Sequence, residues 1–286
     1  MTDTPNHWAR GSNQYQKRSK PPQPRPELPG SSLPRSVVNQ QRAATGIVWD
    51  SASVAWDLLP QSATDRARAR FRAALPEYIW DAASLEGNPY TLPEVQTLLE
   101  GVTVSGHRVY DQNQILALQE AFNYVDTLVG DGTFALTKDV SDEVHRRVAV
   151  HEEIESGHFR GEGNVTGGGL VGLGDLGTYQ ASPPGEHGET LIDEHDRLLR
   201  YLYTLPDARE QAITYFCAAT RAQFYFDGNK RTSRLMMAGH LMASGFDAIS
   251  VSARRRLEYN EHLSTLFDTG DATTLMAFII DCRPEA

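Results

Sequence analysis

Residues 223–234 read Gln223-Phe224-Tyr225-Phe226-Asp227-Gly228-Asn229-Lys230-Arg231-Thr232-Ser233-Arg234, and this stretch concentrates anion-binding groups where an apolar segment turns into a helix. Gly228 and Asn229 are residue types that tolerate positive φ, so consecutive backbone N–H groups can converge on one anion. The N-terminus of the helix that follows adds its partial positive charge. The stretch therefore predicts a phosphate cradle. An ordinary capped helix is the alternative.

The side chains of the stretch add to this prediction. Arg231 and Arg234 are three residues apart and share one helical face. Guanidinium groups bind phosphate oxygens through paired hydrogen bonds, which suits the β- and γ-phosphates of a nucleotide. Asp227 offers the carboxylate oxygen that Mg²⁺ prefers. We therefore expect ATP or another nucleoside triphosphate together with Mg²⁺, and two solvated arginines are the alternative.

The stretch resembles the signature of the Fic (Fido) family, His-x-Phe-x-Asp/Glu-Gly-Asn-Gly-Arg-x-x-Arg. The resemblance covers roughly residues 75–282. It implies an all-α, Fic-like helical bundle with a short β-hairpin flap, and transfer of AMP from ATP to a hydroxyl group of a target protein. It implies a metal ligand at Asp227 and a catalytic role for Arg231. The nucleotide-binding positions that it implies in the signature are Gly228, Asn229, Lys230, Arg231 and Arg234.

Three positions depart from the family pattern. Gln223 stands at the catalytic histidine, Tyr225 replaces phenylalanine, and Lys230 replaces the second glycine. Lysine at that position also resembles the death-on-curing branch, which phosphorylates its target. In the family mechanism that the resemblance implies, the histidine accepts the proton of the target hydroxyl.

A carboxamide at position 223 has no usable basicity near neutral pH, so Gln223 can orient a hydroxyl group but cannot deprotonate it. Loss of a general base typically lowers a rate by a factor on the order of 10²–10⁴. We therefore expect impaired or altered transfer. A plain polar residue near a helix end is the alternative reading of Gln223.

A second landmark is Ser84-Leu85-Glu86-Gly87-Asn88, which resembles the inhibitory helix of N-terminally autoinhibited Fic proteins. Ala82 stands where that helix usually has Ser or Thr, so the match is partial. The resemblance implies that Glu86 pairs with Arg234 and fills the space that a productive γ-phosphate needs. A solvated surface glutamate is the alternative.

Two further segments resemble the sides of the family's flap, which holds an unknown target protein by strand addition. They are Gly157-His158-Phe159-Arg160 and Tyr179-Gln180-Ala181-Ser182-Pro183-Pro184-Gly185. Between them, residues 161–177 are rich in glycine, which equally fits a mobile surface loop. Near the end of the chain, Tyr259 and Asn260 resemble the helix beside the nucleotide base. Core packing and helix capping are their alternatives.

Composition limits the class of protein. The chain has 286 residues with 40% hydrophobic content, enough for one sizeable core or a core with an appendage. A formal charge of −10 argues against a general nucleic-acid or membrane-surface protein. No apolar run approaches the roughly 18 residues of a spanning helix, and no signal peptide is evident, so we expect a cytoplasmic protein. Cys217 and Cys282 are expected to be buried, reduced thiols.

The chain divides into three predicted regions. Residues 1–45 are expected to form a disordered, Pro-rich tail, since they lack the apolar spacing of a core element. Residues 46–100 hold N-terminal helices including the inhibitory helix, and residues 101–286 form the Fic core. Apolar periodicity predicts a helix capped by Ser141, and further helices over 63–75, 77–85, 92–100, 113–128, 191–205, 207–222 and 235–242.

Two classes of function fit these patterns. The first is an enzyme that moves AMP or phosphate onto a protein hydroxyl group, slowed by Gln223 and restrained by Glu86. The second is a catalytically inactive nucleotide-binding regulatory or interaction protein. A third alternative, replacement of a native histidine at position 223, stays open. So do the target protein, the nucleotide base, the role of the tail and whether a homo-oligomer forms.

Overall fold

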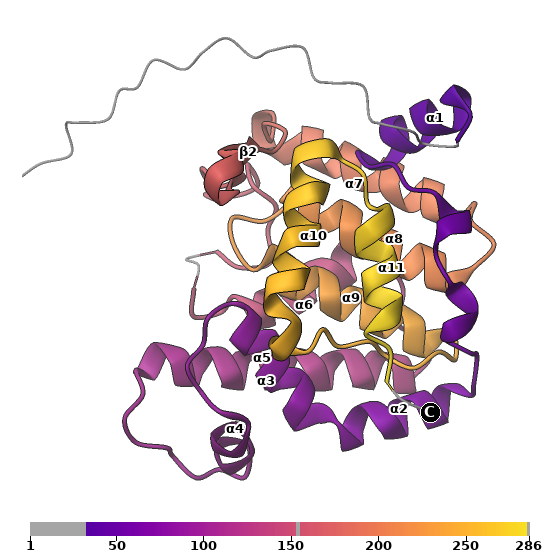
Figure 1. Ribbon diagram of the computed structural model, residues 1–286. Helices are drawn as coiled ribbons and strands as arrows, with labels where there is room; N and C mark the ends of the chain where they lie inside the picture. Colours follow the sequence, from indigo (N-terminus) through magenta and orange to yellow (C-terminus); the bar gives the residue numbers. More distant parts are fainter. Residues whose placement is uncertain (1–32, 153–154, 285–286) are drawn as a thin grey trace, which may run out of the picture. The chain divides into compact units, whose positions relative to one another are not determined.

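The computed structural model describes residues 33–152 and 155–284 (Figure 1). In this part of the chain there are eleven α-helices and one two-stranded antiparallel sheet, which confirms the predicted helical fold with a hairpin. The first six helices are α1 (Arg35–Thr45), α2 (Thr64–Ala73), α3 (Leu75–Leu85), α4 (Leu92–Leu99), α5 (Val109–Gly130) and α6 (Lys138–Val148). The hairpin and the last five helices are β1 (Leu170–Gly172), β2 (Thr178–Gln180), α7 (Glu189–Leu202), α8 (Ala208–Ala222), α9 (Asn229–Ala243), α10 (Arg256–Thr269) and α11 (Thr273–Asp281).

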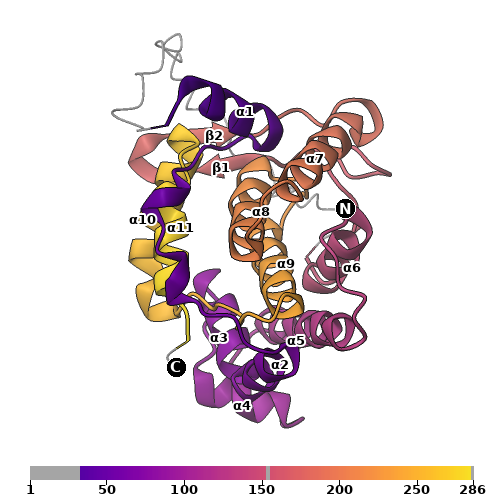
Figure 2. The same cartoon turned by 90° about the vertical axis from the view of Figure 1, so that its right-hand side faces the viewer.

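Helix α9 lies at the centre of the described residues. Nearly all its side chains are buried, including the stretch from Arg231 to Met242. It packs along α8 and also contacts α2, α5 and α6. Figure 2 shows α8 and α9 between the pair α10–α11 on one side and α6 on the other. The turn from α8 to α9 is therefore supported from several directions, and this turn is the stretch 223–228.

Helix α1 corrects the prediction of a tail over residues 1–45. Residues 1–32 lie outside the described residues, but residues 35–45 are helical. Gln41 holds the end of α1, because its amide donates to the carbonyl oxygen of Trp49 and accepts from the N–H of Trp49, both at 3.1 Å. The helix packs on α7. The prediction was wrong for residues 35–45 because tertiary contacts, which weak apolar spacing does not reveal, stabilise them.

The start of α6 differs from the prediction as well. Thr137, and not Ser141, is the N-cap: its hydroxyl oxygen accepts a hydrogen bond from the N–H of Val140 at 3.2 Å. Ser141 lies one turn inside the helix, where it is buried and bonds to the hydroxyl group of Tyr225 at 2.7 Å. A serine in the first turns of a helix therefore serves a tertiary contact here instead of a cap.

The hairpin lies only partly where the sequence predicted it. Strand β2 contains the predicted residue Tyr179, which pairs with Val171 of β1. The other arm therefore comes from the glycine-rich run and not from residues 157–160. In that segment Phe159 and Arg160 are almost fully buried, and the N–H of Arg160 donates to the carbonyl oxygen of Phe224 at 2.8 Å. Residues 157–160 thus support the turn before α9.

Both cysteines are free thiols, as expected. Cys217 is buried, and burial raises its pKa far above the usual range for a thiol. Cys282 is only partly buried, which corrects the prediction of two buried thiols, because it lies at the very end of α11. Within the described residues, no helix has both the length and the apolar character needed to span a membrane.

Candidate active site

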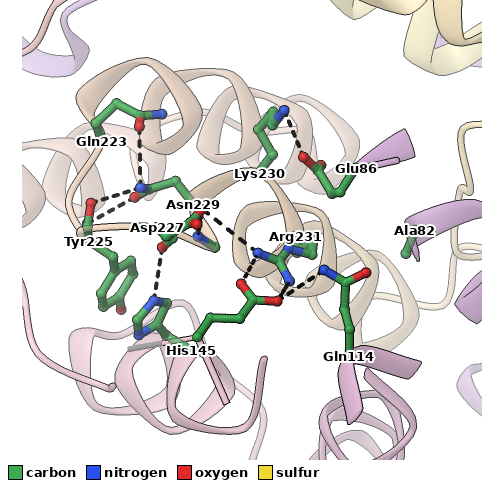
Figure 3. Close-up of polar contacts among 12 residues, drawn as sticks. Ala82, Glu86, Gln114, His145, Gln223, Tyr225, Asp227, Asn229, Lys230 and Arg231 are labelled. Carbon is green, nitrogen blue, oxygen red and sulfur yellow. Dashed lines mark hydrogen bonds and ion pairs between the residues drawn. The ribbon is translucent and has the colours of Figure 1, made fainter. Parts of the chain in front are cut away.

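The turn between α8 and α9 has the backbone geometry that the sequence predicted. Gly228 has φ 68° and is the N-cap residue of α9. The side chain of Asn229 closes the turn: its oxygen accepts from the N–H of Tyr225 at 2.9 Å, and its nitrogen donates to the carbonyl oxygen of Tyr225 at 2.8 Å (Figure 3). The first N–H groups of a helix have no partners within the helix, so the N-terminus of α9 attracts anions.

Arg231 and Arg234 are both buried on α9, and neither extends into solvent. Arg231 forms a bidentate ion pair with Glu152: Nη1 lies 2.5 Å from Oε1, and Nη2 bonds to the second carboxylate oxygen. The side chains of Arg231 and Glu152 are 5% and 3% exposed. Glu152 was not predicted from the sequence as a site residue. Arg234 has a carboxylate partner as well, Glu86.

The predicted pairing of Glu86 with Arg234 is present. Glu86 is the C-cap residue of α3 and places Oε1 3.0 Å from Nη2 of Arg234. Its other oxygen lies 2.8 Å from Nζ of Lys230, and Figure 3 shows the two side chains pointing toward each other. Burial alone would raise the pKa of Glu86, but Lys230, Arg234 and Arg231 lower this pKa to about 2. Glu86 is therefore a carboxylate anion held at the N-terminal end of α9.

Gln223 occupies the end of α8 in a left-handed conformation, with φ 52°. Its amide nitrogen donates to the carbonyl oxygen of Thr220 at 2.7 Å, and its amide oxygen accepts from Asn229 at 3.3 Å. The side-chain nitrogen of Arg160 donates to the carbonyl oxygen of Gln223 at 2.6 Å. Both ends of the amide group thus have partners within the turn.

Asp227 supplies the carboxylate of the turn, and its side chain is 63% exposed. One oxygen accepts from the N–H of Gly228 at 2.6 Å and lies 3.8 Å from Nη2 of Arg231. His145, on α6, holds the backbone of this residue: its Nε2 donates to the carbonyl oxygen of Asp227 at 3.0 Å. Since Nδ1 of His145 accepts from the N–H of Gly157, the proton lies on Nε2.

Tyr259 and Asn260 of α10, which were predicted to lie beside the nucleotide base, differ in their burial. Tyr259 is 1% exposed and packs on Phe278, and its hydroxyl oxygen lies 3.3 Å from Nη1 of Arg234. Tyr259 therefore packs in the core, which was the alternative to its predicted role, and it also contacts Arg234 of the cradle. Asn260 is exposed on α10. The structure brings Tyr259 to the cationic residues and places Asn260 on the surface.

Comparisons with known proteins agree with the geometry of the site. No family model matches the chain. The chain is 30% identical over 215 residues to the protein adenylyltransferase Fic of Aedes aegypti, covering 74% of this chain and 40% of that protein. It is 30% identical over 230 residues to the protein of the same name in Drosophila erecta, covering 77% of this chain and 43% of that protein. The chain thus spans about two fifths of the length of these relatives.

Solved structures show the same fold. Fic-1 (residues 134–508) of C. elegans superposes with a TM-score of 0.63 at 21% identity, covering 87% of this chain and 67% of that chain. A Fic domain containing signaling protein of Bacteroides thetaiotaomicron has a TM-score of 0.61 at 16% identity, covering 87% of this chain and 92% of that chain. The chain belongs to the Fic domain family. Its departures from the Fic signature can therefore be read against the geometry.

Like Gln223, the other two residues that depart from the Fic pattern have polar partners in this chain. The hydroxyl group of Tyr225, where the pattern has phenylalanine, bonds to Ser141 and to Asp142 at 2.7 and 2.9 Å. Lys230, where the pattern has glycine, forms the ion pair with Glu86. The tyrosine is thus accommodated in the interior, whereas the lysine adds a cation to the cradle.

Several residues that build this Fic site were not predicted. Glu152 bonds to Arg231, Gln114 bonds to Glu152, and His145 supports the turn, as does Arg160, which the sequence assigned to the flap instead. Each lies at least 60 residues from the signature in sequence. Glu152 stands in a run of acidic residues after α6 that carries no local pattern, so no sequence signal distinguished it from a solvated glutamate.

Proposed function

We propose that the chain is a protein adenylyltransferase of the Fic type that binds ATP at the start of α9 and is restrained by Glu86. The observation that carries the proposal is the position of Glu86 between Lys230 and Arg234. A carboxylate held by two cations at a helix N-terminus occupies a site built for an anion. The names of the curated relatives support AMP transfer as the reaction.

The residues of the turn fit a magnesium ion that accompanies the nucleotide. Mg²⁺ is commonly held by one or two carboxylates together with substrate phosphates. Asp227, at the edge of the turn and 63% exposed, can supply such a carboxylate oxygen. When bound, the ion neutralises charge that develops on the phosphates.

In this proposal, two arginines bind the nucleotide, and Gln223 limits the rate of transfer. Arg231 and Arg234 bind phosphate oxygens once their carboxylate partners have moved, and the N–H groups at the start of α9 add to this site. Transfer forms a bond between a target oxygen and the α-phosphorus, breaks the bond to pyrophosphate, and releases the proton of the hydroxyl group. Gln223 cannot accept this proton, so it passes to water and transfer is slowed by a factor on the order of 10²–10⁴.

The hairpin of β1 and β2 is the proposed contact for the target protein. It is short and exposed: Leu170 in β1 is 63% exposed, and Leu176 between the strands is 61% exposed. The backbone groups at a sheet edge can pair with an extended segment of another chain. We therefore assign the target to this hairpin, with the first arm moved from residues 157–160 to β1.

A second candidate function is a nucleotide-responsive binding protein without transfer activity. The contacts of Gln223 favour it, because its amide group is bonded to Thr220 and Asn229. A side chain engaged at both ends has to give up one partner before it can orient a target hydroxyl group. A phosphotransferase of the death-on-curing type is a further variant, and it differs in which phosphate is transferred.

One experiment separates these functions. The purified protein and its Gln223→His, Glu86→Gly and doubly substituted variants are incubated with Mg²⁺ and with ATP labelled at the α- or the γ-phosphate. We expect faint α-label on protein from the unaltered chain and at least about 10²-fold more from the double variant, since it has a base and an open cradle. Gln96→His and Glu100→Gly, both at exposed positions of α4 or its end, are the matched controls.

The other outcomes assign the alternatives. Label from the γ-phosphate identifies a phosphotransferase, and label that appears only after Gln223→His identifies a binding protein. If Mg-ATP gives no thermal shift with the Glu86→Gly variant, and Arg231→Ala behaves in the same way, a nucleotide site at α9 is refuted.

A further inference from the structure

The carboxylate of Glu152 binds Arg231 in the same bidentate geometry that a phosphate group adopts on a guanidinium group. The two terminal nitrogens of Arg231 each bond to one carboxylate oxygen of Glu152. A guanidinium group binds two phosphate oxygens through the same pair of parallel N–H groups. Glu152 therefore occupies the edge of Arg231 that a phosphate would use, and both cannot be bound there together.

Glu152 is held in this position by a third residue. Nε2 of Gln114, on α5, donates to Oε1 of Glu152 at 3.0 Å, and Figure 3 shows Gln114 beside Arg231. Burial alone would raise the pKa of Glu152, but the bonds to Arg231 outweigh this and lower the pKa, so the side chain is ionised. The pair is thus a charged, bonded cluster that is closed to solvent.

The cluster is connected to the segment that carries Glu86. The side-chain nitrogen of Asn88 donates to the amide oxygen of Gln114 at 2.9 Å. Asn88 lies two residues after Glu86, and its N–H bonds to the carbonyl oxygen of Ala83 on α3 at 3.1 Å. Gln114 therefore links the residues that follow α3 to Glu152 through two hydrogen bonds.

We propose that Glu152 is a second inhibitory carboxylate, which competes with the nucleotide phosphates for Arg231 while Glu86 competes for Arg234. The inference rests on the proposed nucleotide site. Lys230, Arg231 and Arg234 are then matched in the resting state by two internal anions, and both must leave before a triphosphate binds. The opposite role, in which Glu152 positions Arg231 for the nucleotide, predicts the opposite change in affinity.

The test measures the dissociation constants of Mg-ATP and of inorganic tripolyphosphate by titration calorimetry. Glu152→Gln keeps the shape of the side chain and an oxygen that accepts from Gln114, but it removes the charge. In the Glu86→Gly background, Glu152→Gln is expected to lower both dissociation constants by a factor on the order of ten, within the usual range of such couplings. Glu143→Gln is the matched control, since Glu143 pairs with arginines of α6 outside the cradle.

Gln114→Met is a second variant that weakens the hold on Glu152 without altering the ion pair. It is expected to tighten binding in the same direction by a smaller factor, and it decides the question if Glu152→Gln does not fold. Unchanged or weaker binding by a folded Glu152 variant overturns the inference while leaving the nucleotide site intact. If neither the Glu86→Gly protein nor the Glu86→Gly, Glu152→Gln double variant binds either probe, the proposed function fails together with the inference.

Discussion

The hydroxyl group of Tyr225, which the phenylalanine of the Fic pattern lacks, has hydrogen-bond partners in the protein interior. Its oxygen bonds to Ser141 and to Asp142, and its ring stacks on His145 with ring centres 3.7 Å apart. Burial, together with the charge of Asp142, raises the pKa of this tyrosine well above its usual value. Tyr225 therefore belongs to the support of the turn and not to its anion-binding face.

Tyr225→Phe is expected to destabilise the protein even though it restores the residue of the family pattern. The substitution removes hydrogen bonds to Ser141 and Asp142 and leaves buried groups with fewer partners, at a cost of about 1–2 kcal/mol. Urea unfolding followed by circular dichroism measures the change. Tyr110→Phe, at a tyrosine 49% exposed, is the control with no expected effect. An unchanged unfolding midpoint for Tyr225→Phe would contradict this account.

At the scale of elements, the start of α9 depends on a left-handed residue at its N-cap. Gly228 has φ 68°, and a Cβ atom there would lie 3.3 Å from Nε2 of His145. This residue directs the first N–H groups of α9 toward the cradle, while the side chain of Asn229 ties the turn to Tyr225. The anion site is therefore a property of the helix–turn–helix unit as a whole.

Gly228→Ala is expected to cost about 1–2 kcal/mol of folding free energy, because a left-handed conformation is strained for a residue with a Cβ atom. It is also expected to weaken Mg-ATP binding by the Glu86→Gly variant, since the N–H groups at the start of α9 turn away. Chemical unfolding and calorimetry measure the two effects. Gly172→Ala in β1, where a Cβ atom meets nothing within 4 Å, is the neutral control. Equal effects of the two substitutions would refute the role of Gly228.

For the whole molecule, two buried histidines link stability to pH. Burial lowers the pKa of His195 to about 3, with a smaller contribution from Lys138. Burial also lowers the pKa of His240 to about 4. Both side chains are uncharged in the folded protein at neutral pH, and both take up a proton when the chain unfolds below pH 6.5. The free energy of unfolding is therefore highest above pH 6.5 and falls as the pH decreases from there toward the folded-state pKa values.

Between pH 7.5 and 5.0, each histidine is expected to reduce the free energy of unfolding by about 2 kcal/mol, since a proton bound only by the unfolded state contributes about 1.4 kcal/mol per pH unit. Urea titrations at the two pH values measure the loss. His195→Asn is expected to remove about half of it, whereas His187→Asn, at an exposed side chain, leaves it unchanged. A pH dependence that is the same in the unaltered protein and in His195→Asn would show that burial of His195 is not the cause.

The sequence alone predicted the helical fold and the turn at Gly228, because periodicity and turn residues are local signals, and the resemblance to the Fic family implied the pairing of Glu86 with Arg234. Three features became evident from the packing alone: Glu152 pairs with Arg231, β1 supplies the first arm of the hairpin, and residues 35–45 form a helix on α7. Each of these depends on which surfaces meet after the chain has folded. A solvated glutamate and a buried partner of an arginine have the same local sequence, and packing alone distinguishes them.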